Sequence, residues 1–461
     1  MDVKELKAQL EYKNKSAFES ITEDELERSF AYAESYKLFL DNGKTEREAV
    51  KYSISMAKRN GYTEYKLGDE IAVGGKYYYN NRGKQLILFK VGEESLEKGA
   101  YILAAHIDSP RIDLKQNPLY EDSGFGLFKT HYYGGIKKYQ WTTVPLALHG
   151  VVIKSDGSAI DICIGEDDDE PIFYISDLLP HLAKDQMTKT LAEGITGEGL
   201  NIIVGSEPYR DEETEGAIKL NLLRILNEKY GMVEEDFISA ELTAVPALKS
   251  RDIGLDRSLI AGYGHDDRAC AYSEITALFD SDNTAKTVFA VLADKEETGS
   301  DGVTGMQSEI FADILAEVCE AKNANYRVVK SNSKCLSADV NAAFDPNFPE
   351  VLERKNASFA NCGVVISKFT GSRGKGGTSD ATSEFTAYVR NLFNDNSVVW
   401  QMAELGKVDQ GGGGTVAKFL ANMNIDTIDV GVPVISMHAP YEAISKLDLY
   451  MTYKAFCAFI G

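Results

Sequence analysis

The amino-acid sequence predicts an α/β protein in which a mostly parallel sheet, flanked by helices, is interrupted by an inserted β-rich domain. Apolar strand-like runs alternate with helix-like stretches in residues 1–110 and 251–461, and this alternation is typical of parallel sheets covered by helices. Between them, residues 111–250 change to Tyr- and Gly-rich segments and short β-prone runs. The length of 461 residues also exceeds one ordinary core, at roughly 150 residues per domain.

Residues 1–65 are predicted to be helical. Thr22 and Thr45 are each followed three residues later by a glutamate, the pattern of a capping box, and Gly61 is expected to end the second helix. Strands are expected where β-branched, aromatic and other apolar residues gather, at 70–73, 76–79, 85–89 and 101–105, with a turn at 80–83.

Helices and strands alternate again after residue 250. Helices are predicted at 271–279, 306–321, 382–393, 415–423 and 442–456. Strands are predicted at 287–293, 326–329, 363–366, 397–400 and 427–430. Because the strand that ends at His106 fits this alternation, residues 1–110 and 251–461 are predicted to form one discontinuous domain. Residues 111–250, with a strand near 148–153 and a helix near 216–230, are predicted to be the insertion.

Composition narrows the classes of partner. Acidic residues outnumber basic ones by 71 to 49, which gives a net charge of −22 at pH 7. This balance disfavours nucleic acid and anionic membranes, because both need a basic surface, and it is compatible with divalent cations. No apolar run approaches the roughly 18 residues of a membrane span. Six scattered cysteines without C-x-x-C spacing, and no secretory signal, indicate reduced thiols in a cytoplasmic protein.

Two adjacent glutamates, Glu296 and Glu297, closely follow the apolar run 287–293. Open α/β sheets place their ligands at the C-terminal ends of their strands. Because adjacent side chains point in different directions, one carboxylate is free to bind a metal while the other handles a proton. A solvated acidic loop is the alternative interpretation, since Glu-Glu pairs are common.

Further metal-ligating residue types lie at or near the ends of other strand-like runs. His106 and His438, two of only six histidines, each follow an apolar run, Asp339 closes another, and Asp266 stands just before a helix. Histidines of this kind are usually structural when taken singly. Two histidines and several carboxylates at one edge of a sheet, however, make a nitrogen and oxygen site that suits zinc, cobalt or manganese.

Asp108 stands two residues beyond His106, on the same face of an extended segment. A ligating histidine normally donates its other ring N–H to a carboxylate, which fixes the tautomer. Asp108 is placed to be that partner. The alternative is a turn or cap residue ahead of Ser109 and Pro110.

Six short stretches, in one order, make the chain resemble the aspartyl-aminopeptidase-like family of cocatalytic zinc exopeptidases. They are A-A-H-I-D-S-P-R, H-Y-Y-G-G followed by a Trp, G-Y-G-H-D-D-R, D-K-E-E-T-G-S, L-S-A-D-V and D-V-G-V-P-V-I-S-M-H. The resemblance implies a sheet of the zinc-exopeptidase type and a metal-dependent aminopeptidase that acts on peptides. It also implies two divalent metal ions per subunit, zinc above all, with cobalt or manganese as alternatives.

The resemblance implies a role for each member of the metal-ligating set. His106 and Asp339 would complete the shell of one ion, and Glu297 and His438 would complete that of the other. Asp266, the first acid after Gly264-His265, would bridge the two ions.

Two more residues have implied roles beside the ions. Glu296 would be the general base, which takes a proton from water and passes it to the leaving amine, and Asp108 would orient His106. The sequence departs from the animal branch of the family at Ala342 and Asp345, where that branch has histidines. This departure bears on substrate contacts and not on the metal ligands.

Substrate contacts are less well determined by the sequence. Members of the family with an acidic preference use a lysine in the strand after Ser-Ala-Asp, and Lys368 lies near that place, with an ordinary surface lysine as the alternative. Gly413 belongs to the glycine run 411–414 ahead of a helix, where backbone N–H groups can bind a carboxylate or the substrate backbone. A flexible loop is the alternative there. We expect neutral or acidic N-terminal residues in the substrate.

The resemblance also implies a large homo-oligomer, a tetrahedral dodecamer built from dimers, in which the inserted domain contacts neighbouring subunits. A histidine of that domain would lie near a neighbour's active site, and His131 and His181 are the two candidates.

Two other functions fit part of the sequence. A two-metal amidohydrolase or deacylase of small N-acyl amines would use the same ligands, and a non-enzymatic cation-binding scaffold would not need Glu296. A dinucleotide-binding domain is disfavoured because no G-x-G-x-x-G follows a strand. The ordered set of stretches favours the aminopeptidase.

Overall fold

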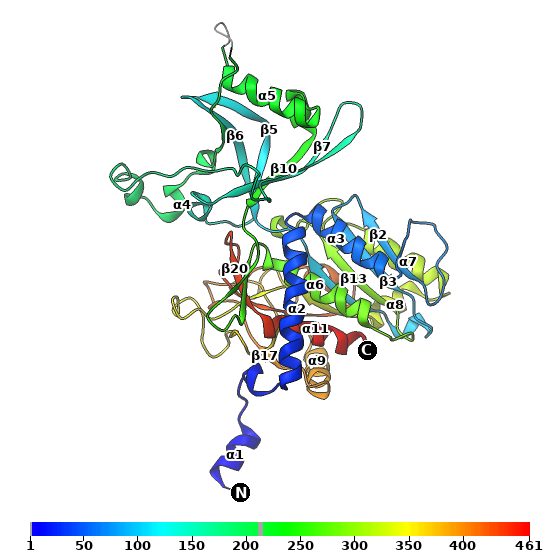
Figure 1. The fold of residues 1–461 in the computed structure, drawn as a ribbon. Coiled ribbons are helices and arrows are strands. Elements are labelled where there is room, and N and C mark those ends of the chain that lie inside the picture. Colours follow the sequence, from blue (N-terminus) through cyan, green and yellow to red (C-terminus); the bar gives the residue numbers. More distant parts are fainter. Residues whose placement is uncertain (1, 211–214) are drawn as a thin grey trace.

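The computed structural model describes residues 2–210 and 215–461, which are arranged in two parts (Figure 1). The larger part holds a nine-stranded sheet, a five-stranded sheet, most of the helices and both ends of the chain. The smaller part holds a six-stranded sheet with α5 (Ala217–Tyr230) packed against it.

The nine-stranded sheet forms the frame of the larger part. In spatial order its strands are β1 (Thr63–Glu64), β2 (Lys76–Asn81), β3 (Gln85–Lys90), β13 (Val288–Ala293), β4 (Tyr101–His106), β14 (Lys334–Ala338), β18 (Asp426–Gly431), β16 (Val364–Ser367) and β17 (Trp400–Met402). The four central strands β13, β4, β14 and β18 run parallel, whereas β3 and β16 are antiparallel to their inner neighbours. The parallel core of the sheet therefore agrees with the prediction, and its margins are mixed.

Helices cover both faces of this sheet. On one face lie α2 (Glu23–Asn42), α3 (Glu46–Arg59), α6 (His265–Asp280), α9 (Ser383–Asp395) and α11 (Lys446–Ile460). On the other lie α7 (Ile310–Ala321), α8 (Tyr326–Asn332) and α10 (Ala417–Asn422). Successive residues of β13 contribute to the two cores alternately, Phe289 to one and Ala290 to the other. Burial on both faces explains why β13 is apolar at every position.

The five-stranded sheet lies beside this frame and gathers distant parts of the chain. Its order is β11 (Arg251–Ile253), β12 (Leu259–Gly262), β20 (Glu442–Ser445), β19 (Pro433–Ile435) and β15 (Asn341–Ala342). Pairing of β12 with β20, and of β19 with β15, holds the segments around residues 265, 340 and 438 next to one another.

The smaller part has its own antiparallel sheet, in the order β8 (Ala159–Ile164), β7 (Leu146–Ile153), β10 (Ala240–Pro246), β5 (Arg111–Asp122), β6 (Phe125–Tyr133) and β9 (Ile202–Gly205). A separate apolar cluster around Trp141, Phe128 and Leu242 forms its core. The short helix α4 (Leu191–Gly194) lies in an arm that projects from this sheet (Figure 1). We keep 111–250 as the proposed inserted domain.

The helix starts predicted at Thr22 and Thr45 are confirmed, since each threonine accepts a hydrogen bond in a capping box at the start of α2 and α3. The strand predicted at 326–329 is wrong. These residues open α8, because Asn325 accepts a hydrogen bond from the N–H of Arg327 and caps a helix there. The strand predicted at 70–73 is a loop.

The last helix, α11, begins at Lys446 rather than at 442, because residues 442–445 pair as β20 and Ser445 caps the helix. The far N-terminal helix, α1 (Val3–Leu10), stands apart from the sheets (Figure 1). Among the described helices we find none with the length and apolar character of a membrane span.

Candidate metal centre

The C-terminal ends of three central strands carry candidate ligands. His106 is the last residue of β4, Asp339 directly follows β14, and the Glu296–Glu297 pair lies just beyond β13. The strands run parallel, and Ala293 pairs with His106 across β13 and β4, so these side chains reach the same edge of the sheet.

Asp266 lies between the two histidines. Its Oδ1 atom is 3.2 Å from Nε2 of His106, and its Oδ2 atom is 3.2 Å from Nε2 of His438. Gly264, with φ of 79°, makes the turn that leads into α6, and a Cβ there would lie only 2.0 Å from the Arg268 side chain. The turn thus requires glycine, and it places Asp266 ahead of the regular part of the helix.

The other predicted ligands divide between the two histidines. Glu297 lies with His438, its Oε2 atom 3.5 Å from Nε2. Asp339 lies with His106, its Oδ1 atom 3.9 Å from Nε2, and Glu296 Oε2 is also 3.9 Å from that nitrogen. The structure therefore brings together all the residues predicted to bind metal or to move a proton.

Asp267 also belongs to this cluster, although the sequence analysis did not single it out. One of its carboxylate oxygens lies within 4.8 Å of ligand atoms of His106 and Asp339. The side chain is fully buried, and neither oxygen has a hydrogen-bond partner. The signal was present in the pair of adjacent acids in G-Y-G-H-D-D-R, of which only the first was used.

The residues present fit divalent metal ions. Buried carboxylate oxygens without donors are costly, and both oxygens of Asp267 and Oε1 of Glu297 are in that position. Cations supply the missing partners, and a set of imidazole nitrogens and carboxylate oxygens matches the ligand preferences of zinc. Ligand atoms of His106, Asp266 and Glu297 also lie within 4.8 Å of one another.

Asp108 lies beside His106, as predicted, and it contacts more than the histidine. The Nδ1 atom of His106 is 3.4 Å from Oδ1 of Asp108 and 3.0 Å from its carbonyl oxygen. The fully buried Asp108 carboxylate accepts hydrogen bonds from the backbone N–H groups of Glu296 and Glu297, at 3.1 and 3.2 Å. A third bond, at 2.8 Å, comes from the hydroxyl of Tyr133.

Glu442 is a second supporting carboxylate that sequence analysis missed. It accepts hydrogen bonds from the backbone N–H of Asp266 at 3.1 Å and from that of His438 at 2.7 Å. Burial raises the pKa of the Glu442 carboxyl to about 8. The sequence predicts a helix start at Glu442, whereas the residue lies in β20 with its side chain turned inward.

Burial and neighbouring charges give the carboxylates of the centre different pKa values. Burial raises the pKa of Glu296 to about 7, and it raises the pKa of Glu297 and of Asp339 well above the usual range. Burial acts in the same direction on Asp266, but the imidazoles of His106 and His438, each 3.2 Å from one of its oxygens, outweigh it and hold the pKa of Asp266 low. Negative charge is therefore held most firmly on the central aspartate.

A cavity of about 400 Å³ opens onto the cluster. Away from the cluster, its walls are formed by Val340, Thr370, Leu405 and Met437, by the glycine loop that contains Gly413, and by one further carboxylate, that of Asp429. No lysine or arginine of the described chain lines it.

The comparison with known families and proteins agrees with this geometry. A family model described as aminopeptidase I zinc metalloprotease (M18) matches residues 39–460. The chain belongs to this family. The "Probable M18 family aminopeptidase 1" of Clostridium acetobutylicum is 50% identical over 459 residues, covering 98% of each chain. That of Thermotoga maritima is 45% identical over 433 residues, covering 92% of this chain and 94% of the relative.

Solved structures of the M18 family have the same fold. Aminopeptidase I from Clostridium acetobutylicum superposes with a TM-score of 0.92 at 47% identity, over 98% of this chain and all of that one. The M18 aminopeptidase from Thermotoga maritima gives 0.93 at 42% identity, over 98% and 99%. The protein is a metallo-aminopeptidase, a hydrolase acting on peptides, and the comparisons do not support the deacylase or the scaffold.

Three predicted substrate contacts of this M18 chain do not line the cavity. Lys368 forms an ion pair with Asp380 and does not line the wall. His131 and His181 have exposed side chains on the smaller part and do not line it either. Of the predicted substrate contacts, only Gly413 reaches the cavity within a single chain.

Proposed function

We propose that this M18 aminopeptidase holds two zinc ions. His106 and Asp339 would bind one ion, His438 and Glu297 would bind the other, and Asp266 would bridge them. The observation that carries the proposal is the position of Asp266, which turns one carboxylate oxygen toward each histidine. Asp267 adds a buried carboxylate beside the first ion.

The experiment is chelation followed by readdition of metal. The protein is stripped with EDTA, titrated with zinc, cobalt or manganese, and assayed with an aminoacyl-arylamide while bound metal is counted. We expect activity to vanish and then to return as two ions bind per chain. Full activity after stripping, or saturation at one ion per chain, would contradict the proposal.

The chain's own residues account for the proton transfers of hydrolysis. Ions bound here would supply a water of lowered pKa and polarise the scissile carbonyl. Glu296 lines the cavity. Its Oε2 atom is 3.9 Å from Nε2 of His106, whereas the nearer oxygen of Asp266 is 3.2 Å from the same nitrogen. Its carboxylate is placed to accept the proton of the attacking water and to return it to the leaving amine. Asp108 fixes both His106 and the backbone of Glu296.

The acidic cluster also favours a substrate with a free α-amine. An ammonium at the N-terminus of a peptide is attracted to the carboxylates that line the cavity, which ties cleavage to the first peptide bond. The neutral side chains of Val340, Leu405 and Met437 would surround the first side chain of the substrate. The ammonium of Lys368 is already paired with Asp380. We therefore propose a preference for neutral N-terminal residues.

The glycine loop is proposed to contact the substrate backbone. Gly412 has φ of 109°, and a Cβ there would lie 2.0 Å from the carbonyl oxygen of Gly371. The loop thus packs too tightly for a side chain at this position, which leaves the main chain of Gly413 facing the cavity.

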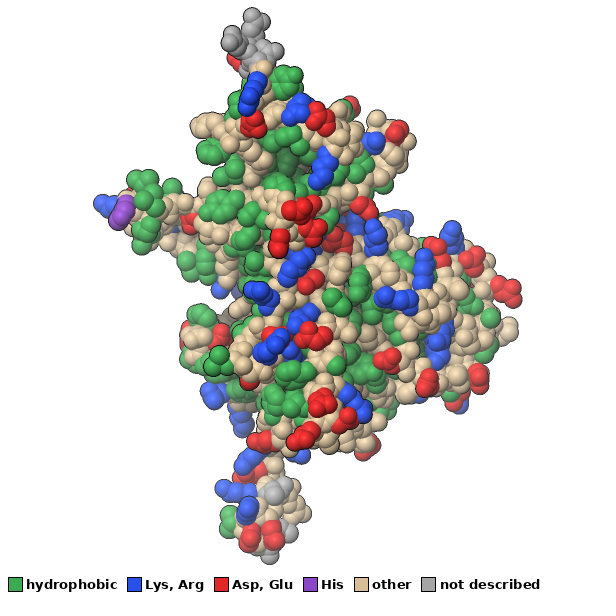
Figure 2. All heavy atoms as spheres, in the orientation of Figure 1, with side chains coloured by type: hydrophobic (Ala, Val, Ile, Leu, Met, Phe, Trp, Pro, Cys, Tyr) green, Lys and Arg blue, Asp and Glu red, His purple; other side chains and the backbone are tan. Residues whose placement is uncertain are grey.

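We also propose that the chain assembles into a homo-oligomer, a dodecamer built from dimers. A solved structure of Saccharomyces cerevisiae mApe1 is described as a dodecamer and shares the fold with a TM-score of 0.75 at 23% identity. Support within this chain comes from the arm near α4, where Figure 2 shows hydrophobic side chains gathered at the surface. Leu178, Leu179, Leu182, Met187 and Leu191 are each at least half exposed there. Exposed apolar clusters of this kind mark contacts between proteins.

The same arm carries His181, and β6 carries His131; one of the two would reach a neighbour's active site in the assembly. A cytoplasmic location remains part of the proposal and draws on the six cysteines, all of which have free thiols.

A further inference from the structure

The end of β6 brings the smaller part of the molecule into contact with the metal centre. Tyr133 is the last residue of this strand, and its hydroxyl donates to Oδ2 of Asp108 at 2.8 Å. Two residues later, the carbonyl oxygen of Gly135 lies 2.8 Å from Nδ1 of His438. One three-residue segment, Tyr133–Gly135, thus supports both histidines that flank Asp266.

We propose that the segment Tyr133–Gly135 positions both histidine ligands, so that the docking of the inserted sheet sets the zinc affinity of the centre. The proposal rests on the two-ion centre described above. It makes Tyr133 a positioning residue, which acts through Asp108 and not on the substrate.

The hydrogen bond from the Tyr133 hydroxyl affects His106 through Asp108. Asp108 is fully buried, and three donors stabilise its carboxylate: the N–H groups of Glu296 and Glu297 and the hydroxyl of Tyr133. Nδ1 of His106 lies 3.0 Å from the carbonyl oxygen of Asp108 and 3.4 Å from the carboxylate, so Asp108 favours a proton on that nitrogen. Nε2 then keeps its lone pair for a metal ion. Losing the hydroxyl removes one of the three donors and loosens both Asp108 and the ring that it orients.

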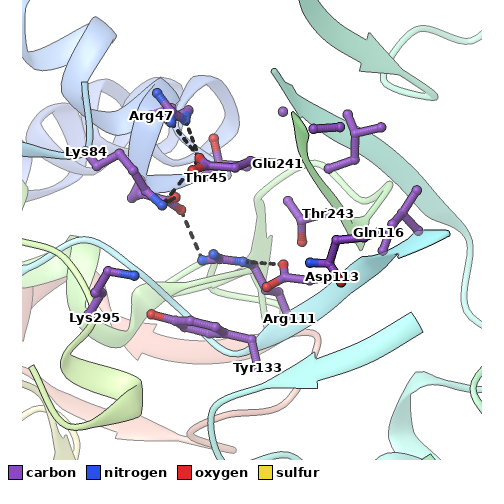
Figure 3. Close-up of a pocket in the computed structure, with 15 residues that line it drawn as sticks. Thr45, Arg47, Lys84, Arg111, Asp113, Gln116, Tyr133, Glu241, Thr243 and Lys295 are labelled. Carbon is purple, nitrogen blue, oxygen red and sulfur yellow. Dashed lines mark hydrogen bonds and ion pairs between the residues drawn. The ribbon is translucent and has the colours of Figure 1, made fainter. Parts of the chain in front are cut away.

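Tyr133 is itself held by charged residues where the two parts of the molecule meet. The guanidinium of Arg111 stands 4.0 Å from the centre of its ring. Figure 3 shows the two side chains beside each other. Arg111 also binds Glu46 of α3 at 3.0 Å and Asp113 of β5 at 2.8 Å. The position of the Tyr133 ring therefore depends on how the inserted sheet docks against α3.

The second contact acts on His438. With Nδ1 donating to the carbonyl of Gly135, the Nε2 atom faces Asp266 at 3.2 Å. The approach is close, because a Cβ at Gly135 would lie 3.2 Å from Nδ1 of His438. A Cβ at Gly134, where φ is 73°, would lie 3.2 Å from Glu297. The two glycines let the backbone pass directly against the ligands of the second ion.

The test compares zinc affinities by competition with a chromophoric chelator. Tyr133→Phe keeps the ring stacked on Arg111 and removes only the hydroxyl. We expect the dissociation constant of one zinc ion to rise about 10-fold, the lower end for loss of a group that supports a ligand. At saturating zinc the variant should still bind two ions. The matched control is Tyr132→Phe, since Tyr132 is an exposed neighbour on the same strand.

A second variant separates the two contacts. Gly135→Ala crowds His438, so crystals grown at limiting zinc should show reduced anomalous scattering beside His438 in this variant and beside His106 in Tyr133→Phe. Zinc affinity within twofold of wild type in both variants would overturn the inference. A wild-type protein that binds fewer than two ions would instead overturn the proposed two-ion centre, so the two failures are distinguishable.

Discussion

The Oδ2 atom of Asp266 lies 3.2 Å from Nε2 of His438, and the other oxygen of the same carboxylate faces His106 at the same distance. A carboxylate between two imidazoles matches the arrangement needed for two metal ions to share one ligand. The proposed ligands, the general base and the positioning role of the inserted sheet all depend on this relationship.

Replacement of Glu296 by glutamine tests the general base. The amide has nearly the same shape but cannot accept the proton of water, so turnover should fall at least about 100-fold while zinc content stays at two ions per chain. Turnover on a leucyl-arylamide and metal analysis on the same sample measure both. Asp301→Asn is the matched control, because Asp301 bonds Gln307 and does not line the cavity. Near-normal turnover of Glu296→Gln would remove Glu296 from this role.

The substrate preference of the enzyme tests whether the cavity favours a neutral first side chain. An acidic first side chain would be buried without a cationic partner, which costs more than the 1.4 kcal/mol that corresponds to a tenfold effect. We expect kcat/KM on leucyl-arylamide to exceed that on aspartyl-arylamide at least about 10-fold. Lys368→Ala should leave this ratio unchanged, because the Lys368 ammonium is paired with Asp380. A preference for the aspartyl substrate that disappears in Lys368→Ala would show that the lysine does reach the substrate.

A buried ion-pair cluster around His149 should make stability depend on pH. Burial would lower the pKa of His149, but hydrogen bonds with Cys163, Glu166 and Glu48 outweigh it and raise that pKa from 6.5 to about 11. Burial would raise the pKa of Glu166, but His149 and Lys44 contribute to lowering it from 4.5 to about 2. Lys249 also binds Glu166, at 2.8 Å.

The directions of these two pKa shifts determine how the stability of the folded protein changes with pH. The raised pKa of His149 adds stability that is complete below pH 6.5 and is lost as the pH rises toward 11. The lowered pKa of Glu166 adds stability that is complete above pH 4.5 and is lost as the pH falls toward 2. The melting temperature of His149→Gln should therefore lie furthest below that of wild type near pH 5.5, and the difference should narrow by pH 9. Calorimetry at both values measures it, and a constant difference would refute the linkage.

The exposed apolar arm near α4 should hold subunits together. Leu182 and Met187 are 69% and 73% exposed, and a glutamate at either position would place a charge in the proposed contact. We expect Leu182→Glu and Met187→Glu to shift the protein to smaller species in light scattering after gel filtration. Leu255→Glu changes a still more exposed leucine outside the arm and should leave the assembly intact. If both arm variants kept the wild-type mass, the arm would have no part in assembly.

Sequence patterns predicted those residues of the metal centre that lie at or just beyond the C-terminal ends of strands. His106, the Glu296–Glu297 pair and Asp339 could be placed because parallel strands deliver their C-terminal residues to one edge. Asp266, at the irregular start of α6, and His438, in a loop after β19, were candidates by residue type, and the resemblance to a family was needed to give them their roles.

The remaining residues were missed for physical reasons. The sequence predicts a helix start at Glu442, because a short strand that pairs with two distant segments leaves no periodic signal. The contacts of Tyr133 and Gly135 with Asp108 and His438 depend on how two parts of the molecule dock, which local sequence does not encode. The pairing of Lys368 with Asp380 depends on how the segment between β16 and α9 folds back on itself, which residue types alone do not predict.

The most direct measurement of the central claim is a crystal structure of the zinc-loaded enzyme with anomalous data at the zinc edge. The account predicts two peaks about 3.5–4 Å apart, the spacing of two-metal hydrolases, with one oxygen of Asp266 bound to each. One peak should lie against His106 and the other against His438. A single peak, or two peaks that do not share Asp266, would contradict the account.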